Sequence, residues 1–196
     1  MGRMERSHDT ARLVLLTGPP AAGKSTVAAA VLEEFGREGR LAVLEHDTFA
    51  EMGGAHLAAG AGAANVWATA LDALVAATKS YLGAGMSVLL VASYGVERKS
   101  LLGSMLAPYE PRHVVILPPW GANRGRLLGR SAADDSPRRL ADISEEAHRP
   151  FHADLTAMAR HGDFDDVITS ARMRPATIAR RVARHLGLVD SGPPST

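Results

Sequence analysis

The sequence predicts an α/β fold with three layers, in which helices cover both faces of a five-stranded parallel sheet. Strand-like runs alternate with helix-like runs along the chain, and this alternation is typical of parallel sheets. The strand-like runs are apolar without interruption, as in Leu13-Val14-Leu15-Leu16, which fits strands buried on both faces. A phosphate-binding motif directly after the first of these runs also belongs to such a fold. We expect strands near residues 12–17, 40–46, 86–92, 113–117 and 166–169.

Helices are expected between these strands. The clearest one covers 65–82, because Asn65 can cap its start, apolar residues recur at helical spacing and Gly83 follows as a stop. Pro175 suits the first turn of the last helix. The full set of expected helices is 24–36, 65–82, 97–107, 123–131, 145–161 and 175–186.

The chain of 196 residues is expected to hold one domain over residues 11–188, with flexible ends at 1–10 and 189–196. Two stretches do not look like core. Residues 49–64 are rich in Gly and Ala, which predicts a poorly packed helix or a mobile substrate loop. Residues 118–142 carry five arginines, and we expect a lid over the nucleotide there; a solvated surface is the alternative.

The bulk composition excludes several classes of protein. The net charge of +1 gives no indication of a nucleic-acid or membrane partner. The absence of cysteine excludes disulfides, thiol chemistry and cysteine-based zinc sites. No apolar stretch has the length of a membrane span, and no apolar signal core is present near the start, so a cytoplasmic location is expected.

The most specific motif is Gly18-Pro-Pro-Ala-Ala-Gly-Lys-Ser-Thr26, which has the phosphate-binding loop (P-loop) pattern G-x-x-x-x-G-K-[ST] between a strand and a helix. Its glycines let backbone N–H groups turn toward a phosphate chain, and the following helix N-terminus adds partial positive charge. Lys24 can reach the β- and γ-phosphates, and the Ser25 hydroxyl can hold Mg²⁺. The expected nucleotide-binding residues here are Gly18, Ala21, Ala22, Gly23, Lys24, Ser25 and Thr26.

The lysine in this motif stands out because the chain has 3 lysines and 19 arginines. A chain that otherwise uses arginine has Lys24 where a compact, flexible ammonium is needed. The alternative is a glycine-rich turn with an incidental lysine.

The second strand ends in Glu45-His46-Asp47, where ligands of open parallel sheets bind. Strand alternation places Glu45 and Asp47 on one face and His46 on the other. One carboxylate can support the Mg²⁺ water shell, and the other can take a proton from an attacking hydroxyl. The alternatives are that Asp47 caps the next segment and that Glu45 is solvated.

The third strand ends at Ser93, where many P-loop ATPases carry a magnesium-binding Asp. Its absence disfavours a motor, a GTPase or an AAA-type protein, and it shifts metal support to Ser25 and the acidic pair. Ser93 is a candidate substrate or phosphate contact, or simply the end of the strand. Arg98 is a candidate substrate ligand, and a surface role is the alternative.

Arg126 and Arg130 are four residues apart and share one helical face. Arginine forks suit bidentate phosphate recognition, so the pair is predicted to close over the γ-phosphate. An exposed basic helix is the alternative. His148 and His152 are also four apart, but Pro150 lies between them, and we expect surface histidines rather than a metal site. Trp67 is expected in the core, and Trp120 in or beneath the lid.

Together these residues resemble the small P-loop kinases of metabolites and antibiotics, a group that includes gluconate kinase-like, shikimate kinase-like, chloramphenicol phosphotransferase-like and zeta-toxin-type enzymes. The resemblance implies that Asp47 takes the proton from a substrate hydroxyl and that Arg130 steadies the transferred phosphoryl. It also implies that the loop 170–174, with Arg174, lies against adenine. The chain departs from the shikimate kinase-like pattern because Glu45 stands at the first acidic position. It departs from the gluconate kinase-like pattern because it lacks the basic substrate cluster after Ser93 beyond Arg98, so neither substrate is supported.

The expected function is therefore transfer of the γ-phosphate of ATP to a hydroxyl of a small polar molecule such as a sugar, metabolite or antibiotic, with Mg²⁺. Lys24, Asp47, Arg126 and Arg130 are the expected catalytic residues, and Glu45, Asp47, Ser93 and Arg98 the expected substrate residues. A nucleoside or nucleotide kinase of the same fold, or a regulatory nucleotide-binding protein without transfer chemistry, is the alternative. A zeta-like toxin falls within the first interpretation.

Overall fold

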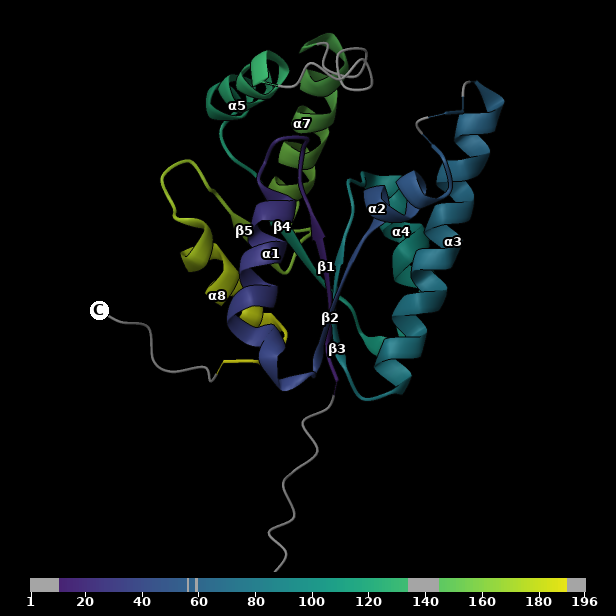
Figure 1. The fold of residues 1–196 in the computed structure, drawn as a ribbon. Helices are drawn as coiled ribbons and strands as arrows, with labels where there is room; N and C mark the ends of the chain where they lie inside the picture. The colour runs from purple at the N-terminus through teal and green to yellow at the C-terminus, as the bar shows by residue number, and fades with distance from the viewer. Residues whose placement is uncertain (1–10, 56, 59, 134–144, 190–196) are drawn as a thin grey trace, which may run out of the picture.

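The computed structural model describes residues 11–55, 57–58, 60–133 and 145–189. The described strands form one parallel sheet in the order β2-β3-β1-β4-β5, which confirms the five expected strands (Figure 1). Because β1 lies at the centre, the loop that follows it emerges between two neighbouring strands. The strands are β1 (Leu13–Thr17), β2 (Leu41–Glu45), β3 (Ser87–Val91), β4 (Arg112–Ile116) and β5 (Asp166–Ile168).

Helices connect successive strands, and every strand pair in the described chain is parallel, as the alternating sequence predicts. In the described ranges each helix is too short or too polar to serve as a membrane span. The α-helices are α1 (Lys24–Phe35), α2 (His46–Met52), α3 (Ala61–Gly83), α4 (Val96–Met105), α5 (Trp120–Ala133), α7 (Glu145–Arg160) and α8 (Pro175–His185). Two short 3-10 turns cover Gly36–Glu38 and Ala107–Tyr109.

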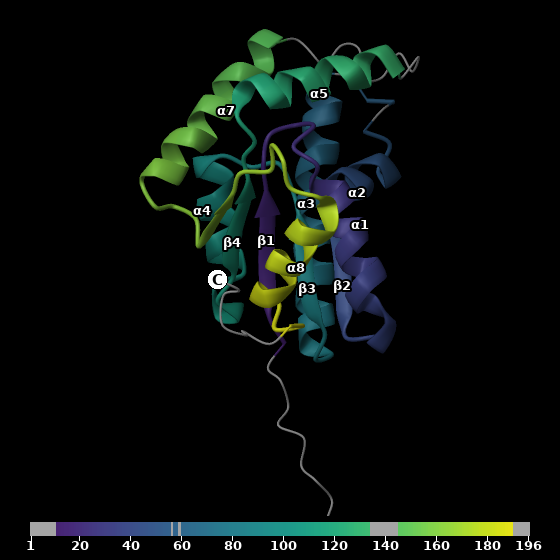
Figure 2. The same ribbon diagram turned by 90° about the vertical axis from the view of Figure 1, so that its left-hand side faces the viewer.

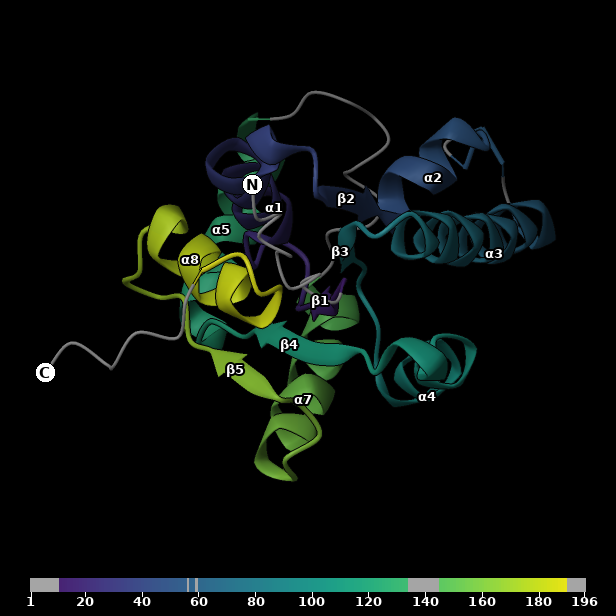
Figure 3. The same cartoon turned by 90° about the horizontal axis from the view of Figure 1, so that it is seen from below.

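The sheet is buried on both faces, and Figure 3 shows its edge between two groups of helices. Alternation along β1 sends Val14 and Leu16 toward a core completed by α1 and α8. Leu13 and Leu15 lie in the opposite core, which α3, α4 and α7 complete. The uninterrupted apolar sequence of the strands follows from this, because each strand must supply both cores.

Helices α5 and α7 cross the carboxyl end of the sheet, toward which the β1 arrow points (Figure 2). The P-loop leaves β1 at this end. A lid over this edge was expected near residues 118–142, and the described part of that range forms α5. Residues 134–142 lie outside the described chain.

The Gly- and Ala-rich stretch differs from expectation. Part of it is helical, because α2 runs to Met52 and α3 begins at Ala61, four residues before the expected start. The high helix propensity of alanine explains the early start in spite of Gly62. Asn65 therefore lies inside α3 and is exposed, and Gly60 occupies the capping position instead.

Candidate functional site

Two glycines shape the P-loop. At Gly18 a side chain would collide with the carbonyl oxygen of Ile116, so the start of the loop lies directly against the backbone of β4. Gly23 has φ 98° and forms the N-cap of α1 without any side-chain cap. A left-handed backbone just before the helix is easiest for glycine, and it leaves the first helical N–H groups to a ligand. This geometry is that of an anion site at a helix N-terminus.

Ala21 is the third unusual position of the loop, since its φ is 59°. Left-handed backbone costs an alanine roughly 1 kcal/mol or more. Such local strain is common where a loop is shaped for a ligand.

Lys24 lies in the first turn of α1 and folds back onto its own loop. Its Nζ donates to the carbonyl oxygens of Gly18 at 3.0 Å and Pro19 at 3.1 Å. Both carbonyls belong to the P-loop, so the ammonium lies against the start of the loop.

Ser25 and Glu45 meet beside the loop, as the Ser25 hydroxyl donates to Glu45 Oε2 at 2.9 Å. A hydroxyl and a carboxylate are the oxygen donors that Mg²⁺ prefers, so the pair fits a metal carried with a nucleotide. In the described residues no cluster of three acidic, histidine or cysteine side chains could hold a metal by itself. A magnesium ion here would therefore need phosphate oxygens and water as further ligands.

Asp47 lies in the first turn of α2 and is exposed. The strand alternation argument for Glu45 and Asp47 is wrong in detail, because β2 ends at Glu45 and a helix begins at His46. His46 is buried, with 2 % of its surface exposed, whereas Asp47 is exposed. Asp47 consequently reaches the carboxyl edge of the sheet from a helix start.

His46 fixes this helix start against α3. Its Nε2 lies 3.1 Å from the carbonyl oxygen of Trp67 and must donate, because a carbonyl only accepts. Its ring also meets the Trp67 ring edge-on, so the half-buried Trp67 lies at the edge of the core. Burial lowers the pKa of His46, and the charge of Arg98 lowers it further. Arg98 lies in the first turn of α4 and is exposed.

Ser93 and Tyr94 follow β3 and contact the start of the P-loop. The Ser93 hydroxyl donates to the Gly18 carbonyl oxygen at 3.5 Å. The Tyr94 N–H donates to Thr17 Oγ1 at 3.1 Å, and the Thr17 hydroxyl donates to the Tyr94 carbonyl oxygen at 3.3 Å. Ser93 thus faces the loop rather than an open pocket in this structure.

Arg126 joins α5 to both sides of the nucleotide region. It donates to the carbonyl oxygen of Ala22 at 3.2 Å, to Ser170 Oγ at 3.3 Å and to Ser170 O at 3.0 Å. The prediction placed Arg126 over the γ-phosphate, whereas its guanidinium here bridges the P-loop and the loop after β5. The difference arises because α5 lies across both loops (Figure 2).

The remaining predicted residues are placed as follows. Thr26 is exposed on α1, and Arg174 is exposed at the N-cap of α8. Arg130 lies on α5, three turns into the helix, and its side chain falls outside the described part of the structure.

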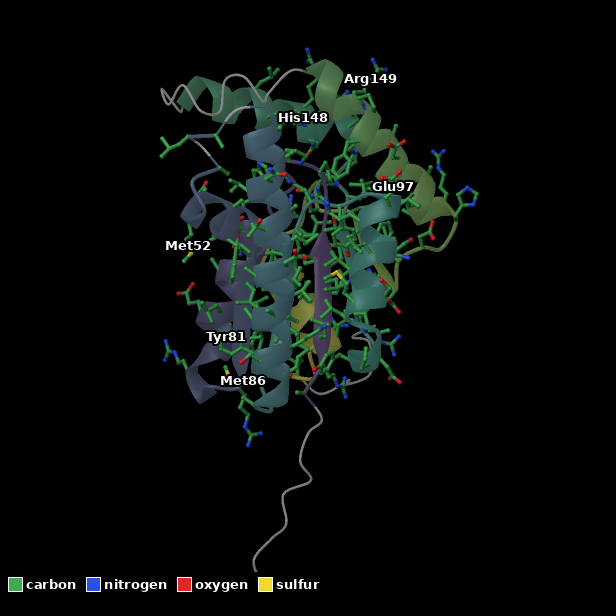
Figure 4. All side chains as sticks on the ribbon, turned by 90° about the vertical axis from the view of Figure 1, so that its right-hand side faces the viewer. Met52, Tyr81, Met86, Glu97, His148 and Arg149 are labelled. Atoms are coloured by element: carbon green, nitrogen blue, oxygen red, sulfur yellow. The ribbon has the colours of Figure 1, made fainter. Side chains whose placement is uncertain are left out.

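His152 corrects another expectation, because it is buried rather than on the surface. Its Nε2 donates to the Pro118 carbonyl oxygen at 2.8 Å, and its ring meets Trp120 edge-on. His148 and Arg149 lie near the start of α7 (Figure 4). His152 therefore joins α7 to the segment that leads into α5, which spacing along the chain could not reveal.

Sequence reasoning also missed Thr17, Tyr94 and Ser170. Thr17 immediately precedes the motif, and its hydroxyl in an otherwise apolar strand was a signal that could have been noticed. The contacts of Tyr94 and Ser170 depend on packing between distant elements, which no local pattern records.

The family comparison matches residues 13–156 to a model described as AAA domain, AAA_33. This match overturns the expectation that the missing Asp after β3 places the chain outside AAA-type proteins. That expectation relied on the absence of a single acid after β3. No curated protein matches the chain.

Solved structures share the fold over nearly their whole length. A sugar kinase from Janibacter sp. HTCC2649 has TM-score 0.61 and 19% identity, covering 91% of this chain and 96% of its own. The Deinococcus radiodurans tunicamycin resistance protein has TM-score 0.62 and 19% identity, with 93% and 99% covered. The shikimate kinase from Acinetobacter baumannii, in complex with shikimate, has TM-score 0.63 and 15% identity, with 90% and 93% covered.

These likenesses place the chain in the fold of P-loop kinases and confirm the three-layer architecture. The family model spans well over half of the chain, including the P-loop, β2 and α5. The chain therefore belongs to the AAA_33 family of AAA domains.

Proposed function

We propose that this protein is an ATP-dependent phosphotransferase that moves the γ-phosphate to a hydroxyl of a small polar molecule. The observation that carries the proposal is the hydrogen bond between Ser25 and Glu45, with Asp47 two residues further on. This contact supports a site at the carboxyl edge of the sheet. In that site, one acid that supports a metal and one carboxylate that can accept a proton lie beside the P-loop. Phosphoryl transfer needs this combination.

On the nucleotide side, the N–H groups at the start of α1 and the ammonium of Lys24 bind the phosphate chain. The Ser25 hydroxyl and the Glu45 carboxylate would hold Mg²⁺, which supplies charge neutralisation at the β- and γ-phosphates when bound. Arg126 fixes the P-loop to the loop after β5, against which adenine would lie.

On the acceptor side, Asp47 is placed to orient the hydroxyl and accept its proton as the oxygen attacks the γ-phosphate. Its exposure is compatible with this role, because an exposed carboxylate is open to a substrate and its oxygens can accept a hydrogen bond. Arg98 and Ser93 border the same edge. Arg130 would complete the site by neutralising the transferred phosphoryl.

The proposal is tested by measuring ATP consumption with a panel of sugars, small metabolites, aminoglycoside-like and phenolic antibiotics, and nucleosides. Transfer is confirmed by the mass of the phosphorylated acceptor. Asp47→Asn is expected to lower kcat by about a hundredfold or more while ATP still binds, in the range of general base removal. Glu51→Asn serves as the control, since it replaces an exposed carboxylate on the same helix.

Two outcomes would replace this proposal. Phosphorylation of nucleosides alone would identify a nucleoside kinase. ATP binding without phosphorylation of any acceptor would indicate a regulatory nucleotide-binding protein, provided that Asp47→Asn binds and consumes ATP as the wild type does.

A further inference from the structure

Thr17 is the last residue of β1. Where β1 and β3 separate, its hydroxyl takes the place of the backbone hydrogen bonds that join the two strands. The ladder between β1 and β3 ends with Ala92 N donating to Leu16 O at 3.1 Å. Beyond this point β1 curls into the P-loop. Thr17 Oγ1 then accepts from the Tyr94 N–H at 3.1 Å and donates to the Tyr94 carbonyl at 3.3 Å. One hydroxyl therefore satisfies both backbone groups of Tyr94.

Tyr94 is a fixed anchor rather than a partner that can follow the loop. Only 1 % of its surface is exposed. Its hydroxyl donates to the Leu15 carbonyl oxygen at 3.2 Å, and His113 Nδ1 lies 3.3 Å from the Tyr94 hydroxyl oxygen. Burial raises the pKa of the Tyr94 phenol, so it remains protonated and able to donate. The ring thus connects the loop end of β3 to the middle of β1 and to β4.

The loop residue beside this anchor is confined on its other side as well. Gly18 has no space for a side chain because the Ile116 carbonyl oxygen of β4 lies against it. The Gly18 carbonyl oxygen accepts from Lys24 Nζ at 3.0 Å and from Ser93 at 3.5 Å. The position of Gly18 therefore influences where the ammonium of Lys24 lies.

We propose that Thr17 is a positioning residue for the nucleotide, which acts by fixing the start of the P-loop to Tyr94. Thr17 touches no phosphate in this scheme. Its hydroxyl holds Gly18 at the distance from β3 and β4 that lets the loop N–H groups and Lys24 converge on the phosphates. The proposal rests on the proposed function only in that ATP is the nucleotide.

Thr17→Val tests the proposal, because valine keeps the shape and removes both hydrogen bonds. Thr17→Ser keeps the hydroxyl and should restore function. The matched control is Thr78→Val: Thr78 is equally buried, and its hydroxyl donates to the Leu74 carbonyl at 2.8 Å within α3, away from the loop. All variants are measured as the full chain by calorimetric titration with MgATP, by thermal unfolding and, once an acceptor is known, by steady-state kinetics.

Thr17→Val is expected to weaken ATP binding by about tenfold, as the loss of buried hydrogen bonds at the loop implies. Thr17→Ser should bind within about threefold of the wild type, and Thr78→Val should bind ATP like the wild type even where it lowers the melting temperature. In turnover, KM for ATP should rise more than kcat falls.

Wild-type affinity in folded Thr17→Val, or an equal loss of affinity in Thr78→Val, would overturn the positioning role. If Thr17→Val does not fold, Tyr94→Phe decides, since it keeps the backbone partners but frees the ring from Leu15 and His113. It should weaken ATP binding by about threefold, and unchanged binding would refute the anchor. Because binding is measured without an acceptor, a failed search for an acceptor leaves this test intact.

Discussion

Ser25 and Glu45 are twenty residues apart in the chain, yet the hydroxyl of one donates to the carboxylate of the other at 2.9 Å. The contact brings the second strand to the phosphate end of the P-loop. It gives this chain an acid beside the loop although Ser93, rather than an aspartate, follows β3.

Glu45→Gln should lower kcat/KM by about tenfold to a hundredfold and raise the Mg²⁺ concentration needed for half-maximal rate, in the range found for groups that support a metal site. Glutamine can still accept from Ser25, so the change isolates the charge. Initial rates over a magnesium series measure it. Glu51→Gln on α2 is the control, and an unaltered magnesium dependence of Glu45→Gln would contradict the assignment.

Arg126→Ala should weaken ATP binding by about tenfold, because three hydrogen bonds from one charged group to Ala22 and Ser170 are lost together. Titration with MgATP measures the effect. Arg180→Ala provides the comparison, since Arg180 forms an exposed ion pair with Glu34 on α1. Equal affinity for both variants would mean that the bridge between the two loops is not used in binding.

Asn123→Leu should raise the free energy of unfolding by about 1 kcal/mol. The Asn123 amide on α5 is fully buried, and within the described residues neither its nitrogen nor its oxygen has a hydrogen-bond partner. Leucine has a similar volume and removes these unpaired groups. Urea unfolding measures the change, with exposed Asn65→Leu as the control. A loss of stability would show that the amide is satisfied by water.

Asp166→Asn should make the stability of the fold depend less on pH in the acid range. Burial tends to raise the pKa of Asp166, but hydrogen bonds from His185 and Arg181 and their positive charges hold it down at about 2. A lowered carboxyl pKa stabilises the fold above the unfolded value of 3.8, and this contribution disappears as pH falls from there toward about 2.

The stability difference between wild type and Asp166→Asn should therefore be constant above pH 5 and shrink below pH 4, about one unit on either side of the unfolded pKa. Thermal melts from pH 6 to pH 2 measure it. Asp163→Asn, which removes an exposed ion pair with Lys99, should change the profile little. A constant difference down to pH 2 would exclude the linkage.

Much of the fold was predictable, because its signals are local. Residues such as Val14 and Leu15 must serve opposite cores, so the strand is apolar throughout and can be identified without its neighbours. The P-loop was predictable for the same reason, because its glycines and Lys24 lie within one short stretch of the sequence. The position of Glu45 beside the P-loop, at the end of β2, was predictable because parallel strands share one carboxyl edge.

The remainder depends on contacts between distant segments. Thr17 and Tyr94 are 77 positions apart, and their pairing follows from the strand order, which the sequence pattern alone does not determine. His152 was misplaced because its burial depends on α7 packing against the segment after β4. The contacts of Arg126 with Ala22 and Ser170 could not be predicted, because the docking of α5 determines what its guanidinium reaches.

Lys24 has one more consequence for ligand choice. In the free protein its ammonium is already held by two carbonyl oxygens of its own loop. The two carbonyl oxygens therefore compete with an incoming anion for the ammonium of Lys24. The anion must bind the ammonium more strongly than these carbonyls do. A single orthophosphate makes few contacts along the loop, whereas a triphosphate can recruit the whole row of N–H groups at once. A polyphosphate chain is therefore expected to bind at this loop more tightly than a single small anion, before any recognition of the base.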